Sequence, residues 1–233
     1  MSDNDMKIII LPGLDGTGLL LTELESILAK ENAVSVIRYP VDRYLYDDLL
    51  SWVKDKLPSD DFIVVAESFA GPLAIMLASQ KPVGLRGIVF VATFARSPLR
   101  LPLFLPHLVR IIPFKSPFLA WLIQPLLMGR WSSKMFTERF QNAVNLVPAR
   151  TFAGRLREVL KVDMRDRLKE LSLPFIYLRA TQDRLVPARM SQDFELVSET
   201  ISTIDGPHFL LQSRASDAAR FILKFAGLLR GTR

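Results

Sequence analysis

The sequence of 233 residues contains no cysteine and only two histidines. Without cysteine there is no disulfide, no thiolate zinc site, no iron–sulfur cluster and no cysteine nucleophile. The two histidines, His107 and His208, are too few for a multi-histidine metal centre. These counts argue against the common metal centres, and the function inferred below implies neither a metal nor a cofactor.

The chain also lacks a long uninterrupted apolar segment. A membrane-spanning helix needs about 18 or more consecutive apolar residues, and the longest candidate, residues 116–129, contains Pro117, Gln124 and Pro125. Residues 1–7 are polar and acidic, and they lack the basic start and cleavage site of a signal peptide. With 49% hydrophobic and 23% charged residues, the composition predicts a globular, cytoplasmic protein.

Acidic residues are absent from residues 68–137, a stretch that contains eight lysines and arginines. The rest of the chain has 22 basic and 24 acidic residues, so the formal net charge of +6 is regional. The same stretch is rich in proline, leucine and aromatic residues, and it has no nucleic-acid-binding motif. We therefore predict no nucleic-acid partner.

Short apolar runs alternate with amphipathic segments along most of the chain. Strands are expected at residues 7–11, 34–39, 61–66, 85–92, 173–180 and near 199–204. Helices are expected at residues 19–29, 47–57, 69–79, near 188–196 and at 215–229. This β-α order predicts a mostly parallel sheet with helices on both faces.

Residues 96–147 interrupt the alternation. Six of the 15 prolines lie from Pro98 to Pro125, so we expect several short helices here in place of a long one. The predicted organisation is an α/β core of residues 1–95 and 148–233 with an inserted helical cap of residues 96–147.

The segment Ala66-Glu67-Ser68-Phe69-Ala70 joins a predicted buried strand to a predicted helix. A serine in a sharp strand-to-helix turn is held in a strained conformation with its hydroxyl exposed, and the residues two positions before and after it must be small. Ala66 and Ala70 meet that requirement, although glycine is usual at both positions. The alternative is that Ser68 only caps the following helix.

A serine nucleophile needs a base, and a histidine base needs an orienting carboxylate. His208 follows the last predicted strand, at the end of the sheet where α/β sites form, whereas His107 lies in the proline-rich insertion. Asp183 follows the strand at residues 173–180. The alternatives are that His208 is a surface-loop residue and Asp183 a turn residue. The order of Ser68, Asp183 and His208, each just after a different strand, favours a catalytic set.

With these residues in this order, the chain resembles the serine hydrolases of the α/β-hydrolase superfamily over about residues 7–95 and 173–229. The resemblance implies an α/β-hydrolase fold and an esterase- or thioesterase-like activity. It also implies the roles of nucleophile, acid and base for Ser68, Asp183 and His208.

The same resemblance implies an oxyanion hole made by two backbone N–H groups, those of Phe69 and Leu14. Leu14 lies in the loop LPGLDGTG, residues 11–18, where glycines let the chain pass close to a substrate. We expect Gly13 and Asp15 to contact substrate as well; the alternative for Asp15 is a hydrogen bond within the loop. A phosphate-binding loop is the alternative, but the spacing is not that of a dinucleotide site and Gly-Lys-Ser/Thr is absent.

The cap is rich in leucine and aromatic residues. We expect Leu99, Phe104 and Trp121 to bind the acyl part of a substrate; the alternative is that these residues only pack the cap against the core. The basic and apolar character of the cap also allows a weak contact with a membrane surface or an acyl carrier. The sequence predicts no particular oligomeric state.

The sequence therefore predicts a hydrolase that cleaves carboxylic esters or thioesters of small to medium acyl substrates through an acyl-Ser68 intermediate. One alternative is an acyltransferase to a lipid or alcohol acceptor, because the LPGLDGTG loop also resembles that of lipid acyltransferase-like relatives. A second alternative is a non-catalytic binding protein with the same fold.

Overall fold

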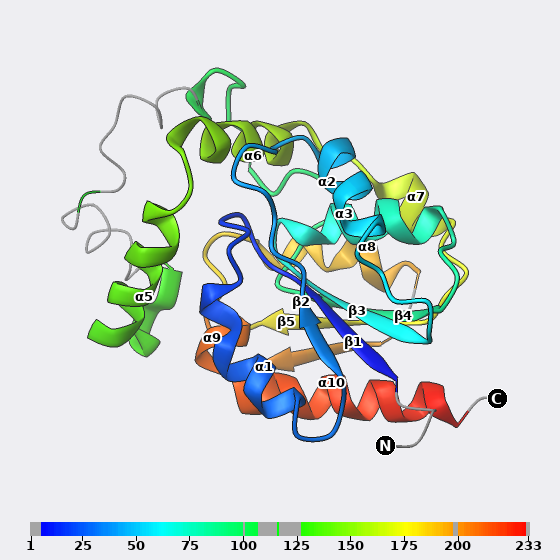
Figure 1. Cartoon of the computed structure of the whole chain (residues 1–233). Helices are drawn as coiled ribbons and strands as arrows, with labels where there is room; N and C mark the ends of the chain where they lie inside the picture. The colour runs from blue at the N-terminus through cyan, green and yellow to red at the C-terminus, as the bar shows by residue number, and fades with distance from the viewer. Residues whose placement is uncertain (1–5, 100, 107–115, 117–126, 198–199, 232–233) are drawn as a thin grey trace.

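A computed structural model describes residues 6–99, 101–106, 116, 127–197 and 200–231 (Figure 1). Within this part of the chain, six parallel strands form one sheet in the order β2-β1-β3-β4-β5-β6. The strands are β1 (Lys7–Leu11), β2 (Val34–Val36), β3 (Phe62–Glu67), β4 (Leu85–Val91), β5 (Phe175–Ala180) and β6 (Ile201–Ile204). The predicted parallel sheet is confirmed.

The helices of the described residues follow the predicted alternation to within a few residues, and α6, α7 and α9 are additional. They are η1 (Leu19–Leu21), α1 (Thr22–Leu28), α2 (Tyr46–Lys54), α3 (Ala70–Ser79), η3 (Gly129–Trp131), α5 (Lys134–Asn145), α6 (Ala149–Lys161), α7 (Arg165–Lys169), η4 (Ala188–Met190), α8 (Gln192–Glu195), α9 (Leu210–Ser213) and α10 (Ala215–Arg230). None of these helices is both long enough and apolar enough to cross a bilayer.

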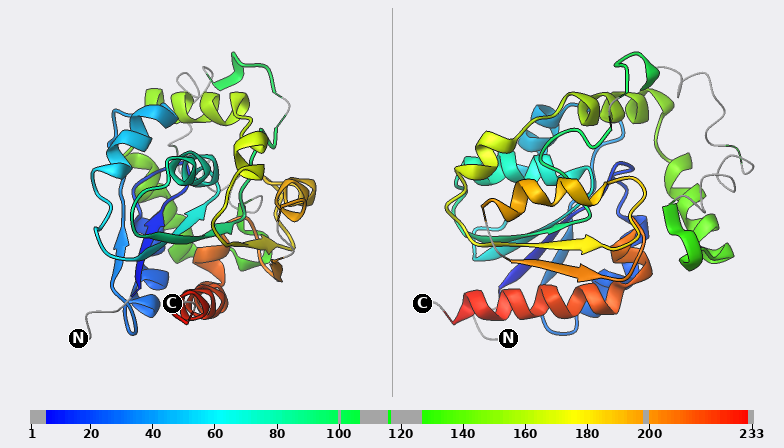
Figure 2. Two further views of the ribbon diagram at one scale, coloured as in Figure 1. Left: turned by 90° about the vertical axis from the view of Figure 1, so that its right-hand side faces the viewer. Right: turned by 180° about the vertical axis from the view of Figure 1, so that it is seen from behind.

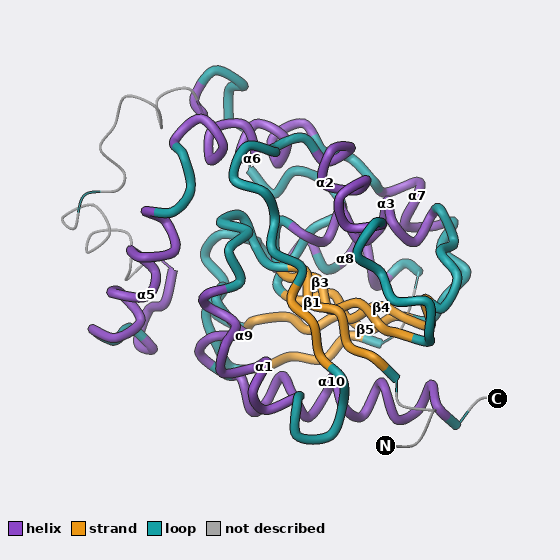
Figure 3. The backbone as a smooth tube through the Cα atoms, viewed as in Figure 1, coloured by secondary structure: helices purple, strands orange, loops and turns teal. Residues whose placement is uncertain are grey.

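Both faces of the sheet are buried, which explains why the strands are apolar runs without alternation. Helices α2, α3, α7 and α8 cover one face through a cluster that includes Leu49, Leu73 and Phe194. Helices α1 and α10 cover the other face through a second cluster that includes Leu24 and Ile222. The sheet therefore forms the middle layer of three, as Figure 3 shows.

The strand register brings the carboxyl ends of the strands to one edge of the sheet. Leu11 at the end of β1 pairs with Ala66 of β3, and Ala180 at the end of β5 pairs with Ile204 of β6. The arrowhead of β5 points toward this edge in Figure 1. The loops that follow β1, β3, β5 and β6 consequently lie together, at the edge where parallel α/β sheets bind ligands.

Helices α5 and α6 lie near this edge (Figures 1 and 2). Helix α5 begins after the last proline of the insertion, where the Ser133 side chain accepts a hydrogen bond from the Phe136 N–H. Phe136 and Phe140 of α5 pack against Phe209, with ring centroids 5.4 and 5.8 Å apart. The cap boundary at residue 147 stays a prediction, and the helical covering continues beyond it through α6.

Candidate active site

Ser68 lies in the turn from β3 to α3 with a backbone φ of 51°. A non-glycine residue in this left-handed region costs about 1–3 kcal/mol, and such strain is concentrated at functional sites. The flanking Ala66 and Ala70 are fully buried. The N-cap residue of α3 is Phe69, and no side chain forms a capping hydrogen bond at the N-terminus of this helix. The hydroxyl of Ser68 is therefore free of the capping role that was its alternative.

The Ser68 hydroxyl meets His208, which in turn meets Asp183. Ser68 Oγ lies 2.9 Å from His208 Nε2, and His208 Nδ1 lies 2.8 Å from Asp183 Oδ2. The other carboxylate oxygen, Oδ1, accepts hydrogen bonds of 2.8 Å from the N–H groups of Leu185 and Val186. The side chains of His208 and Asp183 are only 7% and 5% exposed. The structure thus brings together the three residues that the sequence singled out.

The surroundings of His208 favour its protonated form. Burial by itself lowers the pKa of His208, but the charge of Asp183, its hydrogen bond and the charge of Glu67 outweigh burial and raise the pKa above its usual value. A histidine whose protonated form is stabilised in this way is suited to accept the proton of a neighbouring hydroxyl.

Two backbone N–H groups beside Ser68 are free to bind an oxygen. The N–H groups of Leu14 and Phe69 have no hydrogen-bond acceptor within the described part of the chain. The carbonyls of the same two peptide planes are both held: Gly13 O accepts from the Gly16 N–H at 3.0 Å, and Ser68 O accepts from the Gly71 N–H at 3.1 Å. Since N–H and C=O point in opposite directions across a trans peptide, these bonds fix the direction of both free donors.

Thr93 contributes to this arrangement from the loop after β4. Its hydroxyl donates a second hydrogen bond to Ser68 O. A Cβ on Gly71 would lie 2.0 Å from the Thr93 hydroxyl oxygen. Glycine at position 71 therefore lets Thr93 approach the turn.

A cavity of about 260 Å³ opens at Ser68 and His208. Apart from Asp15, Glu67 and the Ser68–His208 pair, its lining is apolar. The apolar side chains come from the loops after the strands, from the cap and from α6: Leu14, Phe69, Phe94, Pro98, Leu99, Leu127, Phe140, Val144, Phe152, Leu156, Val159, Leu185, Val186 and Phe209. An apolar chain with a carbonyl at one end matches this distribution of surfaces.

Glu67, next to Ser68, is a buried carboxyl group that the sequence did not single out. Its Oε2 accepts a hydrogen bond of 3.1 Å from Gln212 Nε2, while Glu67 Oε1 and Gln212 Oε1 have no partner among the described residues. Burial raises the pKa of Glu67 to about 7, against the opposing effects of the Gln212 hydrogen bond and the charge of His208. A proton on Glu67 would turn one of two unpartnered acceptors into a donor.

Comparison with known proteins agrees with this geometry. The family described as Alpha/beta hydrolase family matches residues 11–221. The chain belongs to this family. Its fold is similar to that of an enol-lactonase from Burkholderia xenovorans, with a TM-score of 0.84 and 13% identity over 96% of this chain and 92% of that one. It is also similar to an esterase from Exiguobacterium antarcticum, with a TM-score of 0.81 and 10% identity over 95% of this chain and 92% of that one.

The comparison with curated proteins finds phytyl ester synthase 1, chloroplastic, of Arabidopsis thaliana, which is 31% identical over 175 residues. The match covers 70% of this chain but only 24% of that protein. The chain thus spans about a quarter of that relative. The prediction of an α/β-hydrolase fold and of an enzyme of the α/β-hydrolase type is confirmed.

Only some of the predicted substrate-binding residues of this α/β hydrolase lie at the cavity. Gly13, Asp15 and Leu99 line the cavity. Phe104 does not, because its side chain is turned to solvent and is 67% exposed. Trp121, like His107, lies outside the described residues. Among the described residues, no group of three or more His, Asp and Glu side chains is placed to hold a metal ion.

The sequence pattern was not interpreted as placing α6 in the wall of the cavity. Phe152, Leu156 and Val159 recur at the i, i+4, i+7 spacing of an amphipathic helix, and all three line the cavity. That spacing was the signal available, and it lies just beyond the predicted end of the cap.

Proposed function

We propose that the chain is a serine hydrolase that cleaves carboxylic esters or thioesters of apolar acyl groups. The observation that carries the proposal is the continuous hydrogen-bonded series Asp183–His208–Ser68 at the polar end of an apolar cavity. Family membership supports a hydrolytic enzyme. The geometry supports catalytic roles for Ser68, His208 and Asp183.

In the first half-reaction, the Ser68 oxygen attacks the acyl carbonyl carbon while His208 Nε2 takes the Ser68 proton. The carbonyl oxygen becomes an oxyanion that accepts hydrogen bonds from the N–H groups of Leu14 and Phe69. When the bond from the carbonyl carbon to the leaving oxygen or sulfur breaks, His208 returns the proton to the leaving group. Asp183 holds the imidazole in the tautomer that this transfer requires.

In the second half-reaction, water attacks the acyl-Ser68 ester. His208 takes a proton from the water, the same N–H groups hold the second oxyanion, and the proton passes to Ser68 as the carboxylic acid leaves. Oxyanion donors of this kind typically contribute about 2.7–4 kcal/mol each to the barrier reduction.

The cavity supports an acyl group of small to medium size. Its volume of about 260 Å³ lies just below the roughly 300–1,000 Å³ typical of ligand sites. Most of its lining side chains are apolar, so burial of an apolar acyl chain there would contribute binding energy.

The test is a set of three variants on p-nitrophenyl esters: Ser68→Ala, His208→Ala and the double variant. We expect each single variant to lose about 10⁴-fold or more in kcat, and the double variant to be hardly worse, because residues of a catalytic unit do not act additively. A fluorophosphonate probe should label the wild type and not Ser68→Ala. Retention of a tenth of the wild-type kcat by Ser68→Ala would exclude Ser68 as the nucleophile.

A second candidate function is acyl transfer to an alcohol. The similarity to a protein named as an ester synthase favours it, and both reactions share the acyl-Ser68 intermediate. The experiment supplies one acyl donor with and without a long-chain alcohol such as phytol, and measures free acid and new ester. Hydrolysis predicts free acid in both cases; transfer predicts ester at the expense of acid when the alcohol is present.

A further inference from the structure

Arg155 of α6 is the largest fully buried side chain in the described part of the protein. Its guanidinium donates hydrogen bonds to four backbone carbonyls: those of Leu14 (3.0 Å), Asp15 (2.7 Å), Pro40 (2.9 Å) and Arg43 (3.1 Å). The carboxylate of Asp15 is turned elsewhere and accepts from the N–H and hydroxyl of Thr17. A buried charge is costly unless it is fully hydrogen-bonded, and here backbone carbonyls alone provide these bonds.

Two of these four carbonyls belong to the loop that carries the Leu14 N–H. Leu14 O and Asp15 O come directly after that donor in the chain, and both contact the same nitrogen, Nη1 of Arg155. Gly16 completes the turn with a φ of +70°, and a Cβ there would lie 2.7 Å from Arg155 Nη1. The loop is therefore folded closely around the guanidinium.

All four carbonyls of the turn from Gly13 to Gly16 are held, whereas the Leu14 N–H has no acceptor among the described residues. Gly13 O accepts from the Gly16 N–H and Gly16 O accepts from the Tyr39 N–H at 2.8 Å, and the two carbonyls between them accept from Arg155. Gly13 O belongs to the peptide plane that carries the Leu14 N–H, and its bond to the Gly16 N–H orients that plane. The two bonds from Arg155 hold the next two peptide planes, so the backbone that follows the Leu14 donor is fixed as well.

The same helix forms part of the cavity wall. Phe152, Leu156 and Val159 of α6 line the cavity, and Arg155 projects from between them toward the loop. An acyl chain packed against this wall therefore rests on the helix that positions the loop.

We propose that Arg155 is a positioning residue for the oxyanion hole, which it links to the acyl-binding wall of the cavity. The inference rests on the proposed function. Arginine suits the task because its planar fork offers five donors in fixed directions, whereas lysine offers a point charge that cannot meet four carbonyls at once. A purely structural Arg155 would stabilise the fold without affecting the chemical step.

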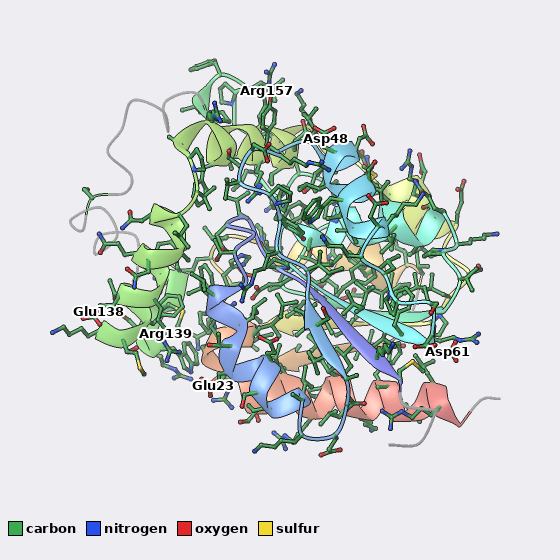
Figure 4. All side chains as sticks on the ribbon, in the orientation of Figure 1. Glu23, Asp48, Asp61, Glu138, Arg139 and Arg157 are labelled. Carbon is green, nitrogen blue, oxygen red and sulfur yellow. The ribbon has the colours of Figure 1, made fainter. Side chains whose placement is uncertain are left out.

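The test compares Arg155→Lys and Arg155→Met with Arg157→Gln, a matched control on the exposed side of the same helix (Figure 4). The concentration of active sites in each protein is first measured by titration with the fluorophosphonate probe, so that kcat refers only to folded, reactive enzyme. We expect Arg155→Lys to lower kcat by roughly 10- to 100-fold, since a misdirected donor loses part of the 10²–10³-fold that one donor supplies. KM should stay within about threefold, and Arg157→Gln should leave kcat and KM unchanged.

A second measurement separates positioning from folding. An alkyl trifluoromethyl ketone binds covalently to Ser68 and leaves an oxyanion in the hole, whereas an alkane of the same chain length, which has no oxygen, tests binding to the apolar cavity alone. In Arg155→Lys the affinity for the ketone should fall by the same factor as kcat/KM, and the affinity for the alkane should not fall. If Arg155→Met does not fold, Gly16→Ala disturbs the same contact from the loop side and should show the same pattern.

Two results overturn the inference. One is an Arg155→Lys enzyme whose kcat per active site is within twofold of wild type, even when it melts at a lower temperature. The other is an equal loss of affinity for the ketone and the alkane. Failure of the probe to distinguish wild type from Ser68→Ala refutes the proposed function instead, so the two failures are distinguishable.

Discussion

Replacing Glu67 by glutamine should change the pH dependence of stability, because burial raises the pKa of this carboxyl group from 4.5 to about 7. Below about pH 4.5 the group is protonated in both the folded and the unfolded chain. Between pH 4.5 and 7 the folded chain keeps a proton that the unfolded chain releases, so the free energy of unfolding falls as pH rises. A difference of about 2.5 pKa units corresponds to about 3 kcal/mol lost by pH 8.

Glu67→Gln keeps the shape of the side chain and its contact with Gln212 but cannot ionise. The assay is urea unfolding of wild type and Glu67→Gln at pH 5 and pH 8. The variant should gain about 2–3 kcal/mol relative to wild type between the two pH values. Glu138→Gln, at an exposed position of α5 (Figure 4), is the control and should behave like the wild type. The same stability difference at both pH values would refute the reasoning.

The kinetics should respond in a defined direction as well. The charge of Glu67 is one of the causes that raise the pKa of His208, so Glu67→Gln should lower that pKa. Since His208 must be neutral to accept the Ser68 proton, the acid limb of the kcat/KM profile should move to lower pH. A limb that moves upward would mean that Glu67 and His208 do not interact in this way.

Three further predictions test other parts of the site. Asp183→Asn should lower kcat by about 10⁴-fold through the wrong imidazole tautomer, measured per titrated active site; a loss below tenfold would contradict the role given to Asp183. Gly71→Ala should destabilise by about 1–3 kcal/mol through overpacking, because its Cβ would lie 2.0 Å from the Thr93 hydroxyl oxygen; calorimetry should show part of this recovered when Thr93→Ala is added, and no recovery would place the strain elsewhere. Lengthening a p-nitrophenyl ester from four to eight acyl carbons should raise kcat/KM by up to about two orders of magnitude, at about 0.8 kcal/mol per methylene less the cost of ordering the chain; a flat profile would mean that the cavity does not bind the acyl group.

The positions of Ser68, Asp183 and His208 could be predicted because they depend on local pattern and topology alone. Each comes after an apolar run that only a buried strand explains, and parallel strands bring their carboxyl-terminal loops to one edge of the sheet. The parallel register then brings the strand ends together, since β1 ends at Leu11, β3 at Glu67 and β5 at Ala180, all near that edge. Asp183 and His208, 25 residues apart, are brought together because η4 and α8 lead back to β6, which lies beside β5.

Arg155 and Glu67 could not be recognised in the same way, because burial of a charged side chain depends on distant partners. Arg155 donates to a carbonyl 141 residues away, and no feature of the surrounding sequence distinguishes it from the exposed Arg157. Glu67 directly precedes Ser68, at a position of the serine turn where the sequence pattern specifies no residue type. Its partner Gln212 is 145 residues away in the chain. Phe104 shows the converse: its apolar character suggested a cavity residue, yet it is exposed.

The two free N–H groups beside Ser68 show that residues recognisable from local pattern and residues with distant partners both contribute to the site. The serine turn orients the Phe69 donor through the bond from the Gly71 N–H to Ser68 O, and Thr93, from the loop after β4, holds the same oxygen. The glycine loop sets the Leu14 donor while Arg155, from the covering helix, holds the two carbonyls that come after it. Each donor is thus fixed by one local turn and one distant side chain. A relative that kept both turns but lost Thr93 and Arg155 would retain the recognisable pattern and, if the proposed function is right, should lose much of the rate.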